Sequence, residues 1–165
     1  YYITGKLLRI IGELEDKPSV VVLTIQKEVA ERLSAKPPKM NLLAASVQFW
    51  GIPEIVRKIS RHAFRPSPKV ESAIIRIVVR EKIPPATKSS IVQDQRSLEY
   101  SYRYYRFIKI LFKQPRKTVA NNLKDGSSLT KQEVEEFLKS HSIDPSLRPQ
   151  NLDIDTINIL SQSFR

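Results

Sequence analysis

The chain has 165 residues, of which 41% are hydrophobic, none is cysteine and two are histidine. This composition fits a folded globular chain and excludes a disordered tail, a disulfide framework and a metal site of the usual thiolate or histidine kind. The 28 Lys and Arg residues outnumber the 17 Asp and Glu residues, so the formal net charge is +11, which indicates a polyanionic partner. No apolar run is long enough to cross a bilayer and no signal-peptide pattern opens the chain, so we expect a soluble, cytoplasmic protein.

The first half of the chain alternates helical and strand patterns. Thr4 is a potential N-cap for a helix that carries Leu7 and Ile11 at helical spacing. Residues 20–25, VVVLTI, are a continuous and largely β-branched run, which predicts a strand buried on both faces. Helices over 26–35 and 41–50, the second capped by Asn41, and strands over 54–59 and 71–79 are predicted to follow. This order indicates an α/β domain and not a helical bundle.

The second half reads as helices after a break in composition. We predict a first domain over 1–82, a linker rich in Pro, Ser, Thr and charge over 83–95, and a helical domain over 96–165. Pro115 suits the first turn of a helix that ends before Gly126, and Thr130 with Glu133 predicts a capping box. The first helix is predicted to bury Tyr104, Ile108, Leu111 and Phe112, and a last helix is predicted over about 153–162.

The α/β part does not contain the sequence features of a nucleotide-cofactor site. Such sheets hold the cofactor at a glycine-rich turn after the first strand, with an acidic residue after the next strand. The four glycines of this chain are isolated, and its first strong strand comes after a helix. We therefore expect only the distal half of such a domain, with no cofactor-binding residue in this chain.

Two stretches are strongly basic and carry little acidic compensation. They span residues 57–69 and 96–117. A phosphate backbone releases counterions when such side chains neutralise it, so these stretches favour nucleic-acid binding over a merely solvated basic face. The candidate phosphate contacts are Arg61, Arg65, Lys113, Arg116 and Lys117. The tyrosines at 100, 102, 104 and 105 could stack on bases, although about half of them must face the core.

Residues 64–73, FRPSPKVESA, place an aromatic side chain before two prolines that hold the chain extended. The segment resembles the Phe-x-Pro-x-Pro-x-Val-x-Ser-Ala segment of the ribosomal RNA adenine dimethyltransferases. The matching residues are Phe64, Pro66, Pro68, Val70, Ser72 and Ala73. Residues 24–33, TIQKEVAERL, are similar to the family's Gln-Lys-Glu-Val-Ala-x-Arg segment. Residues 1–4, YYIT, are similar to the end of its Asn-Leu-Pro-Tyr-x-Ile-Ser/Thr motif.

Two segments of the helical part favour the small-subunit branch of this family. Residues 112–123, FKQPRKTVANNL, and 147–160, LRPQNLDIDTINIL, resemble segments of the small-subunit ribosomal RNA enzymes. The alternatives are a methylase of the erythromycin-resistance type, which acts on large-subunit ribosomal RNA, and a non-catalytic RNA-binding or ribosome-assembly module. A basic DNA-binding domain is disfavoured, because no helix-turn-helix or zinc-ligand spacing is present.

The resemblance implies a fold, an activity and roles for individual residues. The fold would be α/β, the C-terminal half of a Rossmann-like class I methyltransferase domain followed by a small all-α domain. The activity would be transfer of two methyl groups from S-adenosylmethionine to the exocyclic amine of adenines in small-subunit ribosomal RNA. Tyr1 and Phe64 would stack on the adenine, with Pro66, Pro68 and Ser72 supporting the loop. Because the cofactor site would lie mostly in an absent N-terminal half, we expect this chain alone to be inactive.

Overall fold

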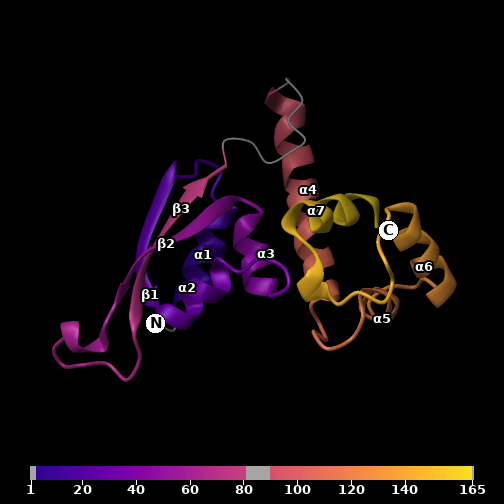
Figure 1. The fold of residues 1–165 in the computed structure, drawn as a ribbon. Coiled ribbons are helices and arrows are strands. Elements are labelled where there is room, and N and C mark those ends of the chain that lie inside the picture. The colour runs from indigo at the N-terminus through magenta and orange to yellow at the C-terminus, as the bar shows by residue number, and fades with distance from the viewer. Residues whose placement is uncertain (1–2, 81–89, 165) are drawn as a thin grey trace.

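The computed structural model describes residues 3–80 and 90–164, with the backbone alone over 90–98. In chain order the elements are α1 (Thr4–Glu13), β1 (Val20–Gln26), α2 (Lys27–Leu33), α3 (Leu42–Gln48), β2 (Gly51–Ile59), the 3₁₀ helix η1 (Arg61–Ala63), β3 (Ser72–Val79), α4 (Ser90–Leu111), α5 (Val119–Asp125), α6 (Lys131–Ser140), the 3₁₀ helix η2 (Pro149–Asn151) and α7 (Ile154–Ser163). Helices α1 to α3 lie between the sheet and the helices α4 to α7 (Figure 1). Residues 3–80 are called the sheet lobe below, and residues 90–164 the helical lobe.

The three strands form an antiparallel sheet in the order β1-β3-β2. Val21 and Ile25 of β1 are buried, whereas Val20 and Val22 are exposed. The prediction of a strand buried on both faces is therefore wrong for the described chain. In this structure α1, α2 and α3 all pack on one face of the sheet, which leaves the alternate side chains of β1 on the open face.

The two edges of this sheet differ in how they are protected. β2 carries Pro53 and the charged side chains of Arg57 and Lys58, and its pairing with β3 is interrupted by a bulge between Ile55 and Arg57. These are the usual features that keep a sheet edge from pairing with another strand. β1, VVVLTIQ, contains no proline and no charge over its seven residues. Its outer edge therefore remains suited to pairing with a further strand.

Helix ends follow local sequence signals at some positions and not at others. Asn41 caps α3 by accepting a hydrogen bond from Ala44 N at 3.1 Å, as predicted. Thr4 is wrong as a cap, because α1 already includes it and Ile3 occupies the N-cap position. Pro115 is wrong as the first turn of a helix: it lies in the α4–α5 connection, and Thr118 caps α5.

The predicted linker over 83–95 stays a prediction. α4 begins at Ser90, so this helix overlaps the second part of that range. Residues 81–89 lie outside the described part of the chain. Side chains predicted to face inward from this helix are buried, as Tyr104, Ile108, Leu111 and Phe112 all show. α7 follows its cap Asp153, close to the predicted start.

The capping box at α6 gives a direct stability prediction. Thr130 Oγ1 accepts a hydrogen bond from Glu133 N at 3.3 Å, and Thr130 N donates to Glu133 Oε2 at 2.7 Å. Replacing Thr130 by alanine is expected to cost about 1 kcal/mol of stability, whereas Ser128→Ala at an exposed neighbouring site is expected to be nearly neutral. Urea denaturation of both variants measures the difference.

The same box has a defined pH dependence. Hydrogen bonds from the side chain and then the backbone of Thr130 lower the pKa of Glu133. Its stabilising contribution is therefore present above the ordinary glutamate pKa and is lost as pH falls through the lowered pKa. The gap between the wild-type chain and Thr130→Ala is expected to be smaller at about pH 3 than at about pH 7. An equal gap at both pH values would contradict this account of the cap.

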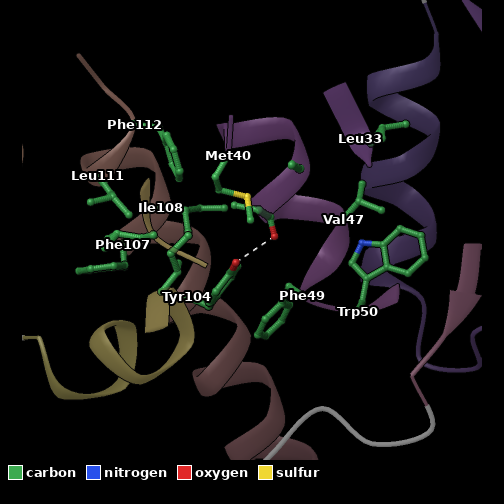
Figure 2. Close-up of a cluster of buried hydrophobic side chains, with 14 of the residues drawn as sticks. Leu33, Met40, Val47, Phe49, Trp50, Tyr104, Phe107, Ile108, Leu111 and Phe112 are labelled. Atoms are coloured by element: carbon green, nitrogen blue, oxygen red, sulfur yellow. Dashed lines mark hydrogen bonds between the residues drawn. The ribbon is translucent and has the colours of Figure 1, made fainter. Parts of the chain in front are cut away.

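An aromatic cluster joins the two lobes. The rings of Phe49 and Tyr104 are stacked with centroids 4.0 Å apart, and Tyr100 and Tyr105 pack on the same phenylalanine. The Tyr104 hydroxyl donates to the Ala45 carbonyl at 2.9 Å (Figure 2). Burial raises the pKa of Tyr104 well above its usual range, which agrees with a neutral hydroxyl donating inside the core.

The remaining tyrosines of this segment divide between core and surface. The Tyr105 hydroxyl donates to the Ser46 carbonyl at 3.3 Å, and burial raises its pKa to about 12. The Tyr100 hydroxyl donates to Asn158 Oδ1 at 2.7 Å. Tyr102 is 69% exposed. Three of the four tyrosines thus anchor the helical lobe, and Tyr102 is the one whose side chain is exposed enough to stack on a base.

Candidate functional site

The connection between β2 and β3 carries the aromatic side chain singled out by the sequence motif. Ser60 caps η1 by accepting a hydrogen bond from His62 N at 3.3 Å. Phe64 follows η1 with extended backbone and is half-buried. Ser67 Oγ donates to the Arg61 carbonyl at 2.9 Å across the loop. These bonds give Phe64 a braced backbone while part of its ring remains accessible.

The base of this loop is tied to the start of α2. Lys27 N donates to the Glu71 carbonyl at 3.0 Å, and Lys27 Nζ lies 2.6 Å from Glu71 Oε2. This contact lowers the pKa of Glu71 and raises that of Lys27, mainly through the side-chain hydrogen bond. Pro66 is exposed, Pro68 is half-buried and Ser72 is buried as the first residue of β3. The contacts between Lys27 and Glu71 therefore hold the base of the β2–β3 connection in place.

The loop projects from one defined end of the sheet. Gln26, which ends β1, and Ile59, which ends β2, both pair with Ser72. The N-terminal end of the described chain lies at this same end of the sheet (Figure 1). Tyr1, the predicted second stacking residue, lies outside the described residues. Because open α/β sheets bind ligands beyond the ends of their strands, this end is the candidate site.

The candidate phosphate contacts fall on two separate connections. Arg61 and Arg65 are exposed on the β2–β3 loop, beside Phe64. The other three, Lys113, Arg116 and Lys117, are exposed on the α4–α5 connection of the helical lobe. Both connections lie toward the lower side of the view in Figure 1, with α2 and α3 between them. The two groups of basic residues therefore do not form one cluster, although both connections lie on the same side of the molecule.

Asn122 is a functional candidate that the sequence analysis missed. It is buried in α5, and both the oxygen and the nitrogen of its side-chain amide form hydrogen bonds to the α4–α5 connection. Its Oδ1 accepts from Gln114 N at 3.0 Å, and its Nδ2 donates to the carbonyls of Gln114 at 3.0 Å and Thr118 at 3.1 Å. The signal in the sequence is the Asn-Asn-Leu run at 121–123. Taken alone, this run reads as an ordinary polar part of a helix, and only the structure shows that Asn122 bonds Gln114 in the α4–α5 connection.

The described residues lack the glycine-rich strand-to-helix turn that is typical of a nucleotide-cofactor site. β1 passes directly from Gln26 into α2, without a glycine-rich turn, and all strand pairs of the described sheet are antiparallel. A cofactor of this class requires backbone N–H groups that approach its polar groups closely at a strand-to-helix turn. Among the side chains that the structure describes, in residues 3–80 and 99–164, no group of histidine and acidic residues is arranged to hold a metal ion. No helix in the same ranges is long and apolar enough to cross a membrane.

Comparison with known proteins agrees with the motif at 64–73. A family model described as ribosomal RNA adenine dimethylase matches residues 1–165. The chain belongs to the ribosomal RNA adenine dimethylase family. Ribosomal RNA small subunit methyltransferase A of Dehalococcoides mccartyi is 32% identical over 160 residues, which cover 97% of this chain and 51% of that protein. The protein of the same name from the onion yellows phytoplasma is 33% identical over 165 residues, with 98% and 56% covered.

Solved structures show that the fold belongs to the same class. A dimethyladenosine transferase from Plasmodium falciparum aligns with a TM-score of 0.78 at 20% identity and covers 99% of this chain and 64% of that one. The 23S rRNA methyltransferase ErmE aligns with a TM-score of 0.69 at 18% identity, with 99% and 62% covered. The predicted α/β methyltransferase fold, followed by helices, is thereby confirmed. The chain spans about half the length of the curated family members that it matches.

Proposed function

We propose that this chain is the distal part of an enzyme that dimethylates the exocyclic amine of adenines in small-subunit ribosomal RNA, in the cytoplasm, with S-adenosylmethionine as the methyl donor. The observation that carries the proposal is the placement of Phe64, half-buried on a braced loop at one end of the sheet, within the family's Phe-x-Pro-x-Pro motif. The curated relatives, named for the small-subunit RNA, support this branch over the resistance methylases.

The edge of the sheet supports the view that the activity needs more than these 165 residues. β1 has an uncharged outer edge, and Val20 and Val22 leave apolar side chains on the open face. A further strand and covering layer would bury this surface. The described residues also lack the turn that would hold the methyl donor. We therefore propose that the chain alone neither binds S-adenosylmethionine nor methylates RNA.

The chemistry that these residues supply is positioning. An adenine amine is a weak nucleophile and is inaccessible inside a base-paired stack, so the base must be extruded and held flat. Phe64 offers one flat surface on a loop that Pro66 and Pro68 restrict, and Tyr1 is the proposed second surface. Arg61 and Arg65 on the same loop would hold the phosphates that flank the extruded nucleotide.

The decisive experiment measures methyl transfer to small-subunit ribosomal RNA by this chain and by a form extended upstream. The extended form is expected to be active and the 165-residue chain inactive. In the extended form, Phe64→Ala is expected to lower the rate by about 5-fold to 150-fold, since a base stacked on an aromatic ring contributes about 1 to 3 kcal/mol. Phe64→Tyr keeps a flat ring and is expected to retain most of the activity.

His62→Ala is the matched control in the same loop. His62 is exposed, and the hydrogen bond that it gives to Ser60 comes from its backbone N–H, which alanine keeps, so we expect nearly unchanged methyl transfer. Loss of activity in His62→Ala but not in Phe64→Ala would contradict the stacking role. An extended form that binds the small subunit without methylating it would favour the assembly-module alternative. Methylation of large-subunit RNA instead would favour the resistance-type alternative.

A further inference from the structure

Two ion pairs tie the β2–β3 connection to helix α2, one at each end of the connection. Lys27 Nζ lies 2.6 Å from Glu71 Oε2, and Lys58 Nζ lies 3.3 Å from Glu31 Oε1. Lys27 and Glu31 both belong to α2 and stand one helical turn apart. Lys58 lies near the end of β2, and Glu71 lies just before the start of β3. These four residues are called the loop clamp below.

The loop clamp holds the connection where it leaves the sheet. β2 and β3 remain paired as far as Ile59 and Ser72, so the two legs of the connection start side by side. At the returning leg, Lys27 N donates to the Glu71 carbonyl at 3.0 Å, which adds a backbone hydrogen bond to the ion pair. One helix therefore fixes both legs of the segment that carries Phe64.

The two ion pairs of the loop clamp also act on each other. The hydrogen bond and charge of Lys27 lower the pKa of Glu71, and the charge of Lys58 adds to this effect. The hydrogen bond and charge of Glu71 raise the pKa of Lys27, and the charge of Glu31 adds to that rise. Each pair thus favours the charged state of the other, so the four residues form one network.

The connection between the two legs is braced internally. Ala63 N donates to the Ser60 carbonyl at 3.0 Å, and Ser67 Oγ donates to the Arg61 carbonyl at 2.9 Å. A segment braced in this way moves as a unit about its ends. A change in the angle at which the legs leave the sheet is therefore passed on to Phe64.

The loop clamp is expected to matter more for rate than for stability. Its four side chains are 32–60% exposed, and ion pairs between side chains as exposed as these contribute little to stability. Misplacement of a group that orients the substrate has a larger effect, since a shift of about 1 Å can lower a rate by about 100-fold.

We propose that the loop clamp positions Phe64 against the extruded adenine, so that its four residues are positioning residues for methyl transfer. This inference rests on the proposed function, in which Phe64 stacks on the base. The clamp acts through Phe64, because it fixes the legs of the connection and not the base itself. RNA affinity depends on many phosphate contacts, so loss of the clamp is expected to lower kcat more than it changes KM.

The first test measures methyl transfer to small-subunit ribosomal RNA by the extended form carrying Lys27→Gln or Glu71→Gln. Each variant is expected to lower kcat about 10-fold and to change KM by less than about 3-fold. The two variants change the net charge in opposite directions, so an effect of charge on RNA binding would have opposite signs. Lys27→Arg keeps the ion pair and is expected to retain most of the rate.

Glu135→Gln is the matched control for these rates. It removes the exposed partner of Lys131 on α6, which lies at the other end of the molecule from the β2–β3 connection (Figure 1). This variant is expected to leave kcat unchanged, because its ion pair touches neither leg of the connection.

The second test asks whether the loop clamp acts through Phe64. In a Phe64→Ala background no ring is left to position, so adding Glu71→Gln is expected to lower kcat by less than about 2-fold further. A full additional loss, equal to that of Glu71→Gln alone, would mean that Glu71 acts independently of Phe64 and would overturn the positioning role.

The third test uses the 165-residue chain and requires no activity. Glu71→Gln removes the ion pair but keeps the carbonyl that accepts the Lys27 N–H, so exchange of this amide reports on opening at the base of the connection. Hydrogen exchange measured by NMR is expected to be about 2-fold to 5-fold faster at Lys27 in this variant. Glu54→Gln, which breaks the equally short pair with Arg76 in the same sheet, is expected to leave the Lys27 exchange unchanged.

The outcomes separate this inference from the function on which it rests. Unchanged kcat in Glu71→Gln overturns the positioning role, whether or not exchange at Lys27 is faster, while a loss of rate in Phe64→Ala still supports the proposed function. An extended wild-type form that methylates no ribosomal RNA overturns both. Circular dichroism of the variants, expected to match the wild-type chain, shows that folded proteins are compared.

Discussion

Replacing Phe49 by alanine is expected to lower the free energy of unfolding by about 3 to 5 kcal/mol. Phe49 is buried at the boundary between the lobes, where it stacks on Tyr104 and also contacts Tyr100 and Tyr105. The substitution removes these ring contacts and leaves a cavity that neither the sheet lobe nor α4 can fill by itself. Urea denaturation followed by fluorescence of Trp50, the single tryptophan, and by circular dichroism measures the effect.

Tyr102→Ala is the matched control for this cluster. Tyr102 lies on the same helix but is 69% exposed, so its loss is expected to change stability by about 0.5 kcal/mol or less. A second variant, Tyr104→Phe, keeps the stacked ring and removes only the hydrogen bond to the Ala45 carbonyl, at an expected cost of about 1 kcal/mol. Equal stability of Phe49→Ala and Tyr102→Ala would show that the cluster does not hold the lobes together.

Replacing Asn122 by alanine is expected to cost about 2 to 4 kcal/mol, the second largest effect. The amide of Asn122 is buried and bonds both N–H and carbonyl groups of Gln114, together with the Thr118 carbonyl. Its removal leaves these backbone groups without their partner at the centre of the α4–α5 connection. Chemical denaturation of the 165-residue chain measures the loss.

Asn121→Ala separates this role from simple helix propensity. Asn121 is the preceding residue of the same helix but is exposed, so its replacement is expected to be nearly neutral. Because Lys113, Arg116 and Lys117 lie on the connection that Asn122 holds, Asn122→Ala is also expected to weaken RNA binding under conditions where it remains folded. Equal stability of the two alanine variants would contradict the proposed bracing.

Short-range signals predicted much of the local structure. The caps at Asn41 and Thr130 formed as expected, since each depends on a side chain and a backbone N–H three residues away. The inward face of α4 was also predictable, because helical spacing alone aligns Tyr104, Ile108 and Leu111. The family was predictable from the Phe-x-Pro-x-Pro segment, because the matching residues lie close together in the sequence.

Other features depended on contacts between distant segments. The run VVVLTI predicted a strand but not its place at an edge, because hydrophobicity does not say how many faces a neighbouring layer covers. Pro115 suited a helix start, yet the amide of Asn122 holds this segment as a connection. Tyr104 and Tyr105 became anchors because α3 presents carbonyls to them from almost sixty residues away.

The sequence by itself determined the family, the alternation of elements, and the identity of Phe64 and the basic residues as candidates, because these depend on local composition and on the order of residues. Only the tertiary structure decided which tyrosines remain exposed, which asparagine braces a loop, and which distant segments lie together. Met40 and Gln150 are more than a hundred residues apart, and a backbone hydrogen bond joins their segments. Such contacts depend on how the chain folds, which no local pattern records.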